Sequence, residues 1–193
     1  MRNNDAEAHA YFAGIPWCAA ALHEPGYVPC ATSSRVPKAS TEDSFYAETL
    51  ATPRTLRRCA SVHSAPLPQA EVEALGGGLA IREARTLVEL GDGVCGFPGI
   101  AHGGLVATLL DEEMGILLTV NADRAEEMSY MTAYLNVRYM GPVRVPGIVC
   151  ARARVVRCEG RKMFVEGEVV DRDGVKLATA ECLFVRARGD PRL

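Results

Sequence analysis

Hydrophobic residues dominate the chain from Gly103 to Val120, and this run contains no proline. It predicts a helix of about five turns, because an α-helix has 3.6 residues per turn. Three consecutive carboxylates, Asp111, Glu112 and Glu113, interrupt the run. They argue against a membrane span and predict a helix that is buried inside the protein.

Downstream of this helix the pattern changes to strand-like runs that are separated by turns containing glycine or proline. Such runs predict an antiparallel meander, and an upstream run predicts a further strand before the helix. The runs are Leu79 to Leu90, Tyr130 to Met140, Ile148 to Arg157, Arg161 to Asp171 and Val175 to Arg188. We therefore expect an α+β fold in which an antiparallel sheet wraps around a long central helix.

Prolines are frequent in residues 1–78, so this part predicts an irregular N-terminal extension. Within it we expect a short helix over Glu7 to Leu22, interrupted at Pro16, and one edge strand over Thr55 to Ser64. A glycine triplet ends the extension. The compact domain is expected to occupy residues 79–188.

The 193 residues carry a net charge of -3, which gives no field that would gather nucleic acid or an anionic membrane. Seven cysteines without a C-x-x-C pair predict reduced thiols. Residues Met1 to Ala10 are too polar for a secretory signal. These features together predict a cytoplasmic protein that binds neither nucleic acid nor membrane.

The three carboxylates of the central helix cannot share one solvated face, because successive helical residues are about 100° apart. At least one of them should face protein or a pocket. We expect Asp111 to be the functional carboxylate, because Ala107 and Gly115 on the same side leave room for a substrate or a second chain. The two glutamates are expected to be structural. Alternatively, all three acids lie at a partly exposed edge or pair with arginines such as Arg138.

Gly103 and Gly104 open the helix, where backbone N–H groups without side chains can bind an oxyanion. The alternative is a loop-to-helix turn that needs glycine flexibility. Gly103 and Asp111 lie eight residues apart, so a helix separates them by roughly 12 Å. If both act on one carbonyl, one of them comes from a second subunit related by a two-fold axis. The spacing thus predicts a homodimer with two shared sites.

Period-two alternation in the first strand after the helix places four polar residues on one face, where they could line a site. An exposed strand edge is the alternative. The four residues are Thr132, Tyr134, Asn136 and Arg138. Near the Gly160 turn, Arg161 and Lys162 could hold a phosphate. The alternative is that they belong to a solvated hairpin tip.

The motif Gly99-Ile100-Ala101-His102-Gly103-Gly104 followed by Asp111 resembles the signature of hotdog-fold thioesterases of the phenylacetyl-CoA thioesterase-like branch. Residues 136–142 and 159–162 are similar to the same family, and the resemblance covers residues 79–187. The segment Phe45 to Leu50 is similar to fungal members, some of which serve polyketide or other secondary-metabolite pathways.

The resemblance implies a homodimer or a dimer of dimers that hydrolyses an acyl-CoA or acyl-carrier-protein thioester. It implies no cofactor and no metal, since CoA or phosphopantetheine is part of the substrate. The Gly103 N–H would polarise the thioester carbonyl, and His102 would support the loop or the thiolate leaving group. Asp111 of the partner subunit would activate water or attack directly, and Thr132 would position the water. The expected substrate contacts are Gly104, Asn136, Arg161 and Lys162.

One departure from the family pattern precedes the motif. Many relatives have asparagine six or seven residues before the histidine, where this chain has Gly96 and Cys95. Two alternatives therefore stay open. The first is a dehydratase, isomerase or other polyketide-tailoring enzyme on the same fold, and the second is a non-catalytic acyl-CoA-binding protein.

Overall fold

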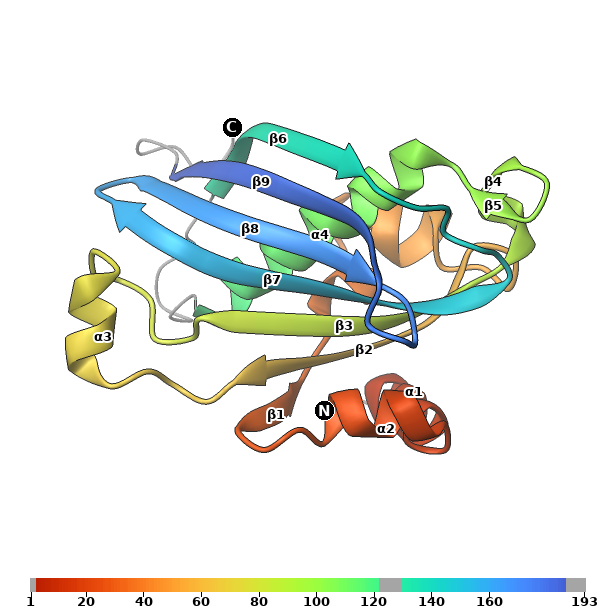
Figure 1. Ribbon diagram of the computed structural model, residues 1–193, viewed down its shortest axis with the longest axis horizontal. Coiled ribbons are helices and arrows are strands. Elements are labelled where there is room, and N and C mark those ends of the chain that lie inside the picture. Colours follow the sequence, from red (N-terminus) through yellow and green to blue (C-terminus); the bar gives the residue numbers. More distant parts are fainter. Residues whose placement is uncertain (1–2, 122–129, 187–193) are drawn as a thin grey trace.

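The chain folds around one seven-stranded antiparallel sheet, shown in Figure 1 by a computed structural model that describes residues 3–121 and 130–186. A separate hairpin of β4 (Cys95–Phe97) and β5 (Ile100–Ala101) precedes the central helix. The sheet order is β1 (Tyr27–Cys30), β2 (Leu56–Ser64), β3 (Glu83–Leu90), β7 (Gly147–Glu159), β8 (Lys162–Val170), β9 (Lys176–Arg186) and β6 (Tyr130–Tyr139).

The predicted central helix is confirmed as α4 (Gly103–Asn121), which lies along one face of the sheet in Figure 1. Its core positions are Leu109, Leu110, Met114 and Leu117, each no more than 1% exposed. Burying one such side chain contributes about 2 kcal/mol. Gly167 in β8 permits this contact, because a Cβ there would lie 2.6 Å from Met114 Cε. Within the described ranges, no helix is long and apolar enough to span a membrane.

The predicted strands all form, with small shifts of their ends, but the predicted order of the last four is wrong. Strand β6 pairs with β9 rather than with its sequence neighbour β7. After α4 the chain returns along the free edge of the sheet, and residues 140–146 then carry it to β7 in the middle. The final residues of the predicted strand Val175 to Arg188 lie outside the described ranges.

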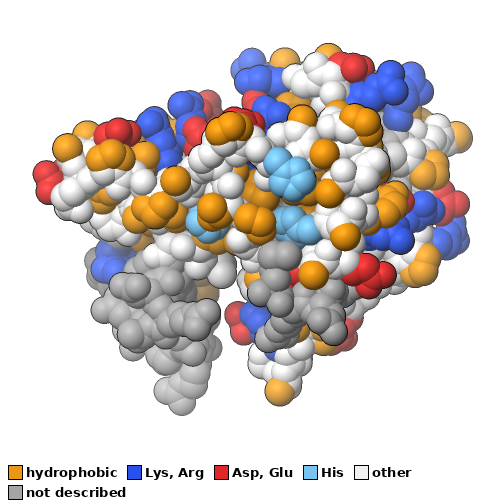
Figure 2. Space-filling view, turned by 90° about the horizontal axis from the view of Figure 1, so that it is seen from below, with side chains coloured by type: hydrophobic (Ala, Val, Ile, Leu, Met, Phe, Trp, Pro, Cys, Tyr) orange, Lys and Arg blue, Asp and Glu red, His pale blue; other side chains and the backbone are white. Residues whose placement is uncertain are grey.

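The N-terminal residues add helices and strands to the outer face and edge of this sheet. As predicted, Pro16 divides the first helical region, since it occupies the first position of the second helix. The short elements are α1 (Asn3–Ala13), α2 (Pro16–Leu22), α3 (Gln69–Ala74), 3-10 turns at Ser33–Arg35 and Asp92–Val94, and a π-helix at Phe45–Thr49. Figure 2 shows histidine side chains among hydrophobic ones on the face where α1, α2 and β1 lie.

The N-terminal extension packs tightly against the sheet, which an irregular extension would not be expected to do. Phe12 and Leu22 are buried against Leu87 on the outer face of β3. The strand expected over Thr55 to Ser64 forms as β2, but β1 covers its outer side, so it is not the edge strand. Residues 27–64 thus extend the sheet by two strands beyond β3.

Residues 31–55, which we call the strap, pack against α4 and appear in orange behind it in Figure 1. Tyr46 and Leu50 from the strap join the core cluster that contains the buried residues of α4. The Arg35 guanidinium donates hydrogen bonds to the carbonyls of Tyr46 (3.1 Å) and Leu56 (2.8 Å), which ties the strap to the start of β2. The central helix is therefore enclosed by the sheet and by the strap.

Candidate active site

The first turn of α4 has one backbone donor without an intramolecular partner. His102 caps the helix, because its Nδ1 accepts a hydrogen bond from the Gly104 N–H at 2.9 Å. Its carbonyl accepts a further bond from the Leu105 N–H at 2.9 Å. In the described part of the chain, the Gly103 N–H has no hydrogen-bond acceptor. It is thus the donor of this turn that can bind a developing oxyanion.

This arrangement separates the roles expected for the two glycines. Gly104 was expected to contact the substrate, but its N–H is already bonded to the His102 ring. Gly103 is half-buried, its N–H has no acceptor in the described part of the chain, and as a glycine it adds no side chain of its own beside that donor.

About two turns further along α4, a carboxylate and a hydroxyl meet. The Thr132 Oγ1 donates a hydrogen bond to Asp111 Oδ1 at 2.9 Å, so the helix and β6 contribute one residue each. Asp111 is half-buried, and its second oxygen keeps its lone pairs for another donor. A water molecule bound to this second oxygen, Oδ2, would meet a carboxylate that Thr132 holds in place through Oδ1.

A β-bulge between Thr132 and Tyr134 brings about this contact. It moves Thr132 onto the inner face of the sheet, where Leu135 and Val137 pack against the core. The expectation that Thr132 and Asn136 share one face is therefore wrong, because the extra residue of the bulge reverses the alternation.

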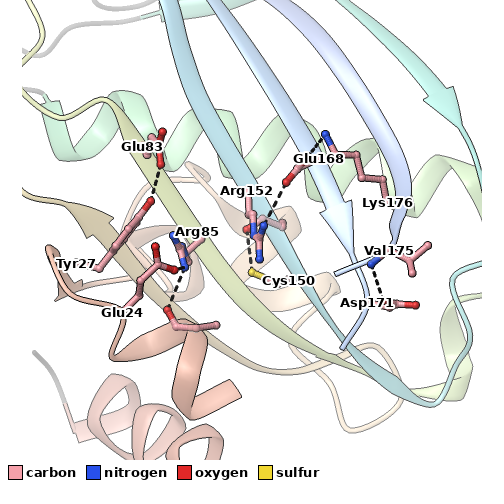
Figure 3. A network of polar contacts seen from close by, with 12 residues as sticks. Glu24, Tyr27, Glu83, Arg85, Cys150, Arg152, Glu168, Asp171, Val175 and Lys176 are labelled. Atoms are coloured by element: carbon pink, nitrogen blue, oxygen red, sulfur yellow. Dashed lines mark hydrogen bonds and ion pairs between the residues drawn. The ribbon is translucent and has the colours of Figure 1, made fainter. Parts of the chain in front are cut away.

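Asn136 lies on the outer face, in a groove of about 740 Å³ that it lines together with Arg138. Figure 3 shows part of the same face, where Glu168 forms ion pairs with Arg152 at 3.4 Å and with Lys176 at 2.7 Å. The sheet thus separates Asn136 and Arg138 from Asp111. Neither of them pairs with the acids of α4.

The two basic residues expected to hold a phosphate lie at the β7–β8 turn. Arg161 donates a hydrogen bond to the Arg186 carbonyl at 2.8 Å, and Lys162 is exposed. Lys162 is paired with Val185, which in turn is paired with Met131. Two strand spacings place the Lys162 backbone about 10 Å from that of Met131, which is the residue before Thr132. The turn therefore lies at the Thr132 end of the sheet.

The residues expected to act together fall into two groups within one chain. His102 and Gly103 lie at the start of α4, and Asp111 with Thr132 lies roughly 12 Å away along the helix. A single carbonyl cannot contact both groups of the same chain.

Tyr139, which was not among the residues expected to line a site, belongs to the first group. Its hydroxyl donates a hydrogen bond to the Gly103 carbonyl at 2.9 Å. The sequence signal for Tyr139 is a tyrosine at the end of a strand. It follows the alternating apolar residues that face the helix, so its hydroxyl can lie near the start of α4.

The carboxylate that is fully buried is Glu113, which is 1% exposed, rather than Asp111. Burial raises the pKa of Glu113 to about 8, because the charged form loses its hydration. The Thr86 hydroxyl is near enough to offset part of this effect on the pKa, but neither carboxyl oxygen has a hydrogen-bond partner in the described chain. The expectation that at least one of the three acids faces the interior is confirmed by Glu113, whereas Asp111 is only half-buried.

Glu112 lies beside the strap. Burial raises its pKa to about 7, while Ser34 and Arg35 of the strap lower it by hydrogen bonding and charge. Both glutamates therefore face the packed interior between α4, the strap and β3, and neither lies next to Thr132.

Comparisons with known proteins agree with this architecture. The family model for the thioesterase superfamily matches residues 98–178, which include α4 and β6. A solved structure of the putative thioesterase yhdA from Lactococcus lactis superimposes with a TM-score of 0.51 at 15% identity. That likeness covers 56% of this chain and 84% of the other, and it supports the fold alone.

Two curated relatives each match part of the chain. Acyl-coenzyme A thioesterase THEM4 of Rattus norvegicus is 33% identical over 51% of this chain and 40% of its own length. Verlamelin biosynthesis protein B of Lecanicillium sp is 27% identical over 59% of this chain and 60% of its own length. The match therefore spans less than two thirds of either relative. Residues 98–178 thus resemble the thioesterase superfamily, and the fold is the hotdog fold.

Proposed function

We propose that this chain hydrolyses an acyl thioester of CoA or of a carrier-protein phosphopantetheine. The observation that carries the proposal is the hydrogen bond that holds Asp111 to Thr132, on the same helix as the unpaired Gly103 N–H. The superfamily match and the name of the rat relative support the same reaction class.

In the proposed reaction, the free oxygen of Asp111 accepts a proton from a water molecule, whose oxygen attacks the thioester carbonyl carbon. The oxyanion that forms accepts a hydrogen bond from the partner subunit's Gly103 N–H. Collapse of this intermediate breaks the C–S bond and releases the carboxylic acid product and a thiolate. The partner subunit's His102 lies beside that donor and can hydrogen bond to the departing sulfur.

A site shared by two copies follows from the roughly 12 Å between Gly103 and Asp111 on one helix. Strand β6 offers a surface for the second copy, since it is ten residues long and its outer edge has no described partner strand. Met131 and Met140 near its ends are 47% and 57% exposed. We propose that β6 pairs with its copy across a two-fold axis, in a homodimer or a dimer of dimers.

The test uses two single-residue variants that disable different halves of the site. Asp111→Asn removes the proton acceptor and keeps the size of the side chain. Gly103→Pro removes the N–H, and proline is well tolerated at the first position of a helix. Gly103→Ala is the matched control, since it adds a Cβ at an ordinary 3.5 Å from Tyr139 and keeps the N–H.

Each disabling variant alone should lose thiol release by at least about 100-fold, whereas Gly103→Ala should retain it. When equal amounts of Asp111→Asn and Gly103→Pro are unfolded and refolded together, random pairing should restore about one quarter of the parent activity. No recovery in confirmed heterodimers would rule out the shared site. Parent-like activity of Asp111→Asn would rule out the proposed reaction.

The fungal relative with a biosynthetic name motivates a narrower substrate proposal, namely an acyl thioester of a secondary-metabolite pathway such as a polyketide. A panel of CoA and carrier-protein thioesters, scored by thiol release and product mass, tests it. Mass changes without thiol release would indicate a dehydratase or isomerase. Tight binding without either would indicate an acyl-CoA-binding protein.

We also propose that the protein works in a reducing compartment such as the cytoplasm. All seven cysteines are free, and the side chains of Cys18, Cys59, Cys150 and Cys182 are buried. Free thiols in this number are typical of intracellular proteins.

A further inference from the structure

Tyr139 contacts the start of α4 in two ways. Its hydroxyl donates to the Gly103 carbonyl at 2.9 Å. Its ring carbon Cζ lies 3.5 Å from the position that a Cβ on Gly103 would occupy. The tyrosine therefore both bonds to the first helical residue and flanks it.

The backbone that carries Tyr139 is held firmly at the end of β6. Tyr139 is paired with Ala178 of β9. Immediately after it, the N–H groups of Met140 and Gly141 donate to the Leu177 carbonyl at 2.8 and 3.0 Å. These bonds fix where the hydroxyl can reach.

The hydrogen bond from Tyr139 acts on a peptide unit with a second role. The Gly103 carbonyl and the Gly104 N–H belong to the same peptide plane, so orienting one orients the other. The Gly104 N–H donates to His102 Nδ1 at 2.9 Å. Hydrogen bonding at a carbonyl also polarises its amide and strengthens the N–H as a donor.

The bond to Nδ1 fixes the proton of the neutral imidazole. Since Nδ1 accepts, the ring must carry its proton on Nε2. In the described part of the chain, Nε2 has no hydrogen-bond partner, and His102 is exposed. The ring is therefore presented as a donor rather than as a base.

We propose that Tyr139 is a positioning residue for the thioester-binding end of α4. Through the Gly103–Gly104 peptide it holds His102 as the Nε2–H tautomer and keeps the Gly103 N–H aligned beside it, as two parallel donors for the substrate. The kinetic part of this inference rests on the proposed thioester hydrolysis, whereas the tautomer does not depend on it.

The first test measures the tautomer without substrate. Long-range ¹⁵N NMR of the full chain distinguishes which imidazole nitrogen carries the proton, and the His102→Asn spectrum assigns the resonance. The parent should show His102 as the Nε2–H form. Tyr139→Phe, which keeps the ring and removes the hydroxyl, should show a mixture of both tautomers. The matched control is Tyr134→Phe on the same strand, which should leave the His102 spectrum unchanged.

The second test measures hydrolysis. Tyr139→Phe should lower kcat about tenfold, as expected for one lost hydrogen bond, with KM within twofold of the parent. Tyr134→Phe should change neither constant. A merely structural role would instead lower the melting temperature and reduce the active fraction, which active-site titration would reveal.

Three outcomes overturn the proposal. The first is a parent His102 that carries its proton on Nδ1, and the second is a His102 spectrum that Tyr139→Phe leaves unchanged. The third is a Tyr139→Phe enzyme whose kcat stays within twofold of the parent. If the parent hydrolyses no thioester at all, the proposed function fails, and the NMR measurement still decides the tautomer.

Discussion

The Thr132 hydroxyl donates to Asp111 Oδ1 at 2.9 Å, and this bond joins the middle of α4 to the edge strand β6. Thr132→Val keeps the shape of the side chain and removes the donor, so Asp111 would lose the contact that orients it. We expect kcat/KM for thioester hydrolysis to fall about tenfold, as for one lost hydrogen bond to a charged group. Thiol release measured over a range of substrate concentrations checks this.

Thr132→Ser is the matched control for that prediction. It keeps the hydroxyl and loses only a methyl group, so its kcat/KM should stay within about threefold of the parent. Equal losses in the serine and valine variants would show that the hydroxyl is not the group that matters.

Because of the bulge in β6, we make the opposite prediction for Asn136, which lies four residues after Thr132. Its side chain lines the outer groove, on the far side of the sheet from Asp111. Asn136→Ala should therefore leave both kcat and KM within twofold of the parent. A loss as large as that of Thr132→Val would mean that Asn136 faces the same side of the sheet as Thr132, as it would if β6 had no bulge.

The elements of this fold could be predicted from the sequence because each has a strong local pattern. The proline-free apolar run gave the position of α4, and glycine turns separated the strands. Pro16 likewise marked the start of α2. An oxyanion role could be proposed for Gly103 from the sequence because the start of a helix leaves backbone N–H groups without partners inside the helix.

The relations between elements could not be predicted in the same way. The pairing of β6 with β9 depends on where the chain crosses the sheet, and no local pattern encodes that. The single extra residue of the bulge decides the faces of Thr132 and Asn136, and no sequence signal marks it. The burial of Glu113 depends on how α4 packs against β3, where Thr86 is its neighbour, and no local pattern of α4 encodes that contact.

Close packing of α4 on β8 leads to a stability prediction at Gly167. A Cβ there would lie 2.6 Å from Met114 Cε and 3.3 Å from Leu110 Cδ2, so Gly167→Ala must displace the end of the methionine. We expect a loss of about 1 to 2 kcal/mol in the free energy of unfolding, measured with urea. In a Met114→Leu background the same substitution should cost less, because the clashing methyl group is gone. Equal costs in both backgrounds would contradict this packing.

Buried Glu113 makes the stability of the protein depend on pH. Its pKa is about 8 in the folded chain, against an ordinary value of 4.5, so the folded state binds more protons than the unfolded state between these values. This contribution to stability is complete below about pH 4.5 and is lost as the pH rises through about 8. The free energy of unfolding should then fall with pH by up to about 1.4 kcal/mol per unit.

Two single variants separate Glu113 from its neighbour Glu112, because burial raises the pKa of both. Glu113→Gln cannot ionise, so its urea unfolding free energy should fall less steeply between pH 4.5 and pH 8 than that of the parent, whereas the matched control Glu112→Gln should keep the part of the fall that Glu113 causes. Glutamine also keeps the size of the side chain, so a flatter profile would reflect the lost titration rather than a new cavity. A slope in Glu113→Gln equal to that of the parent would show that another group releases the proton, and that Glu113 is already ionised beneath the strap.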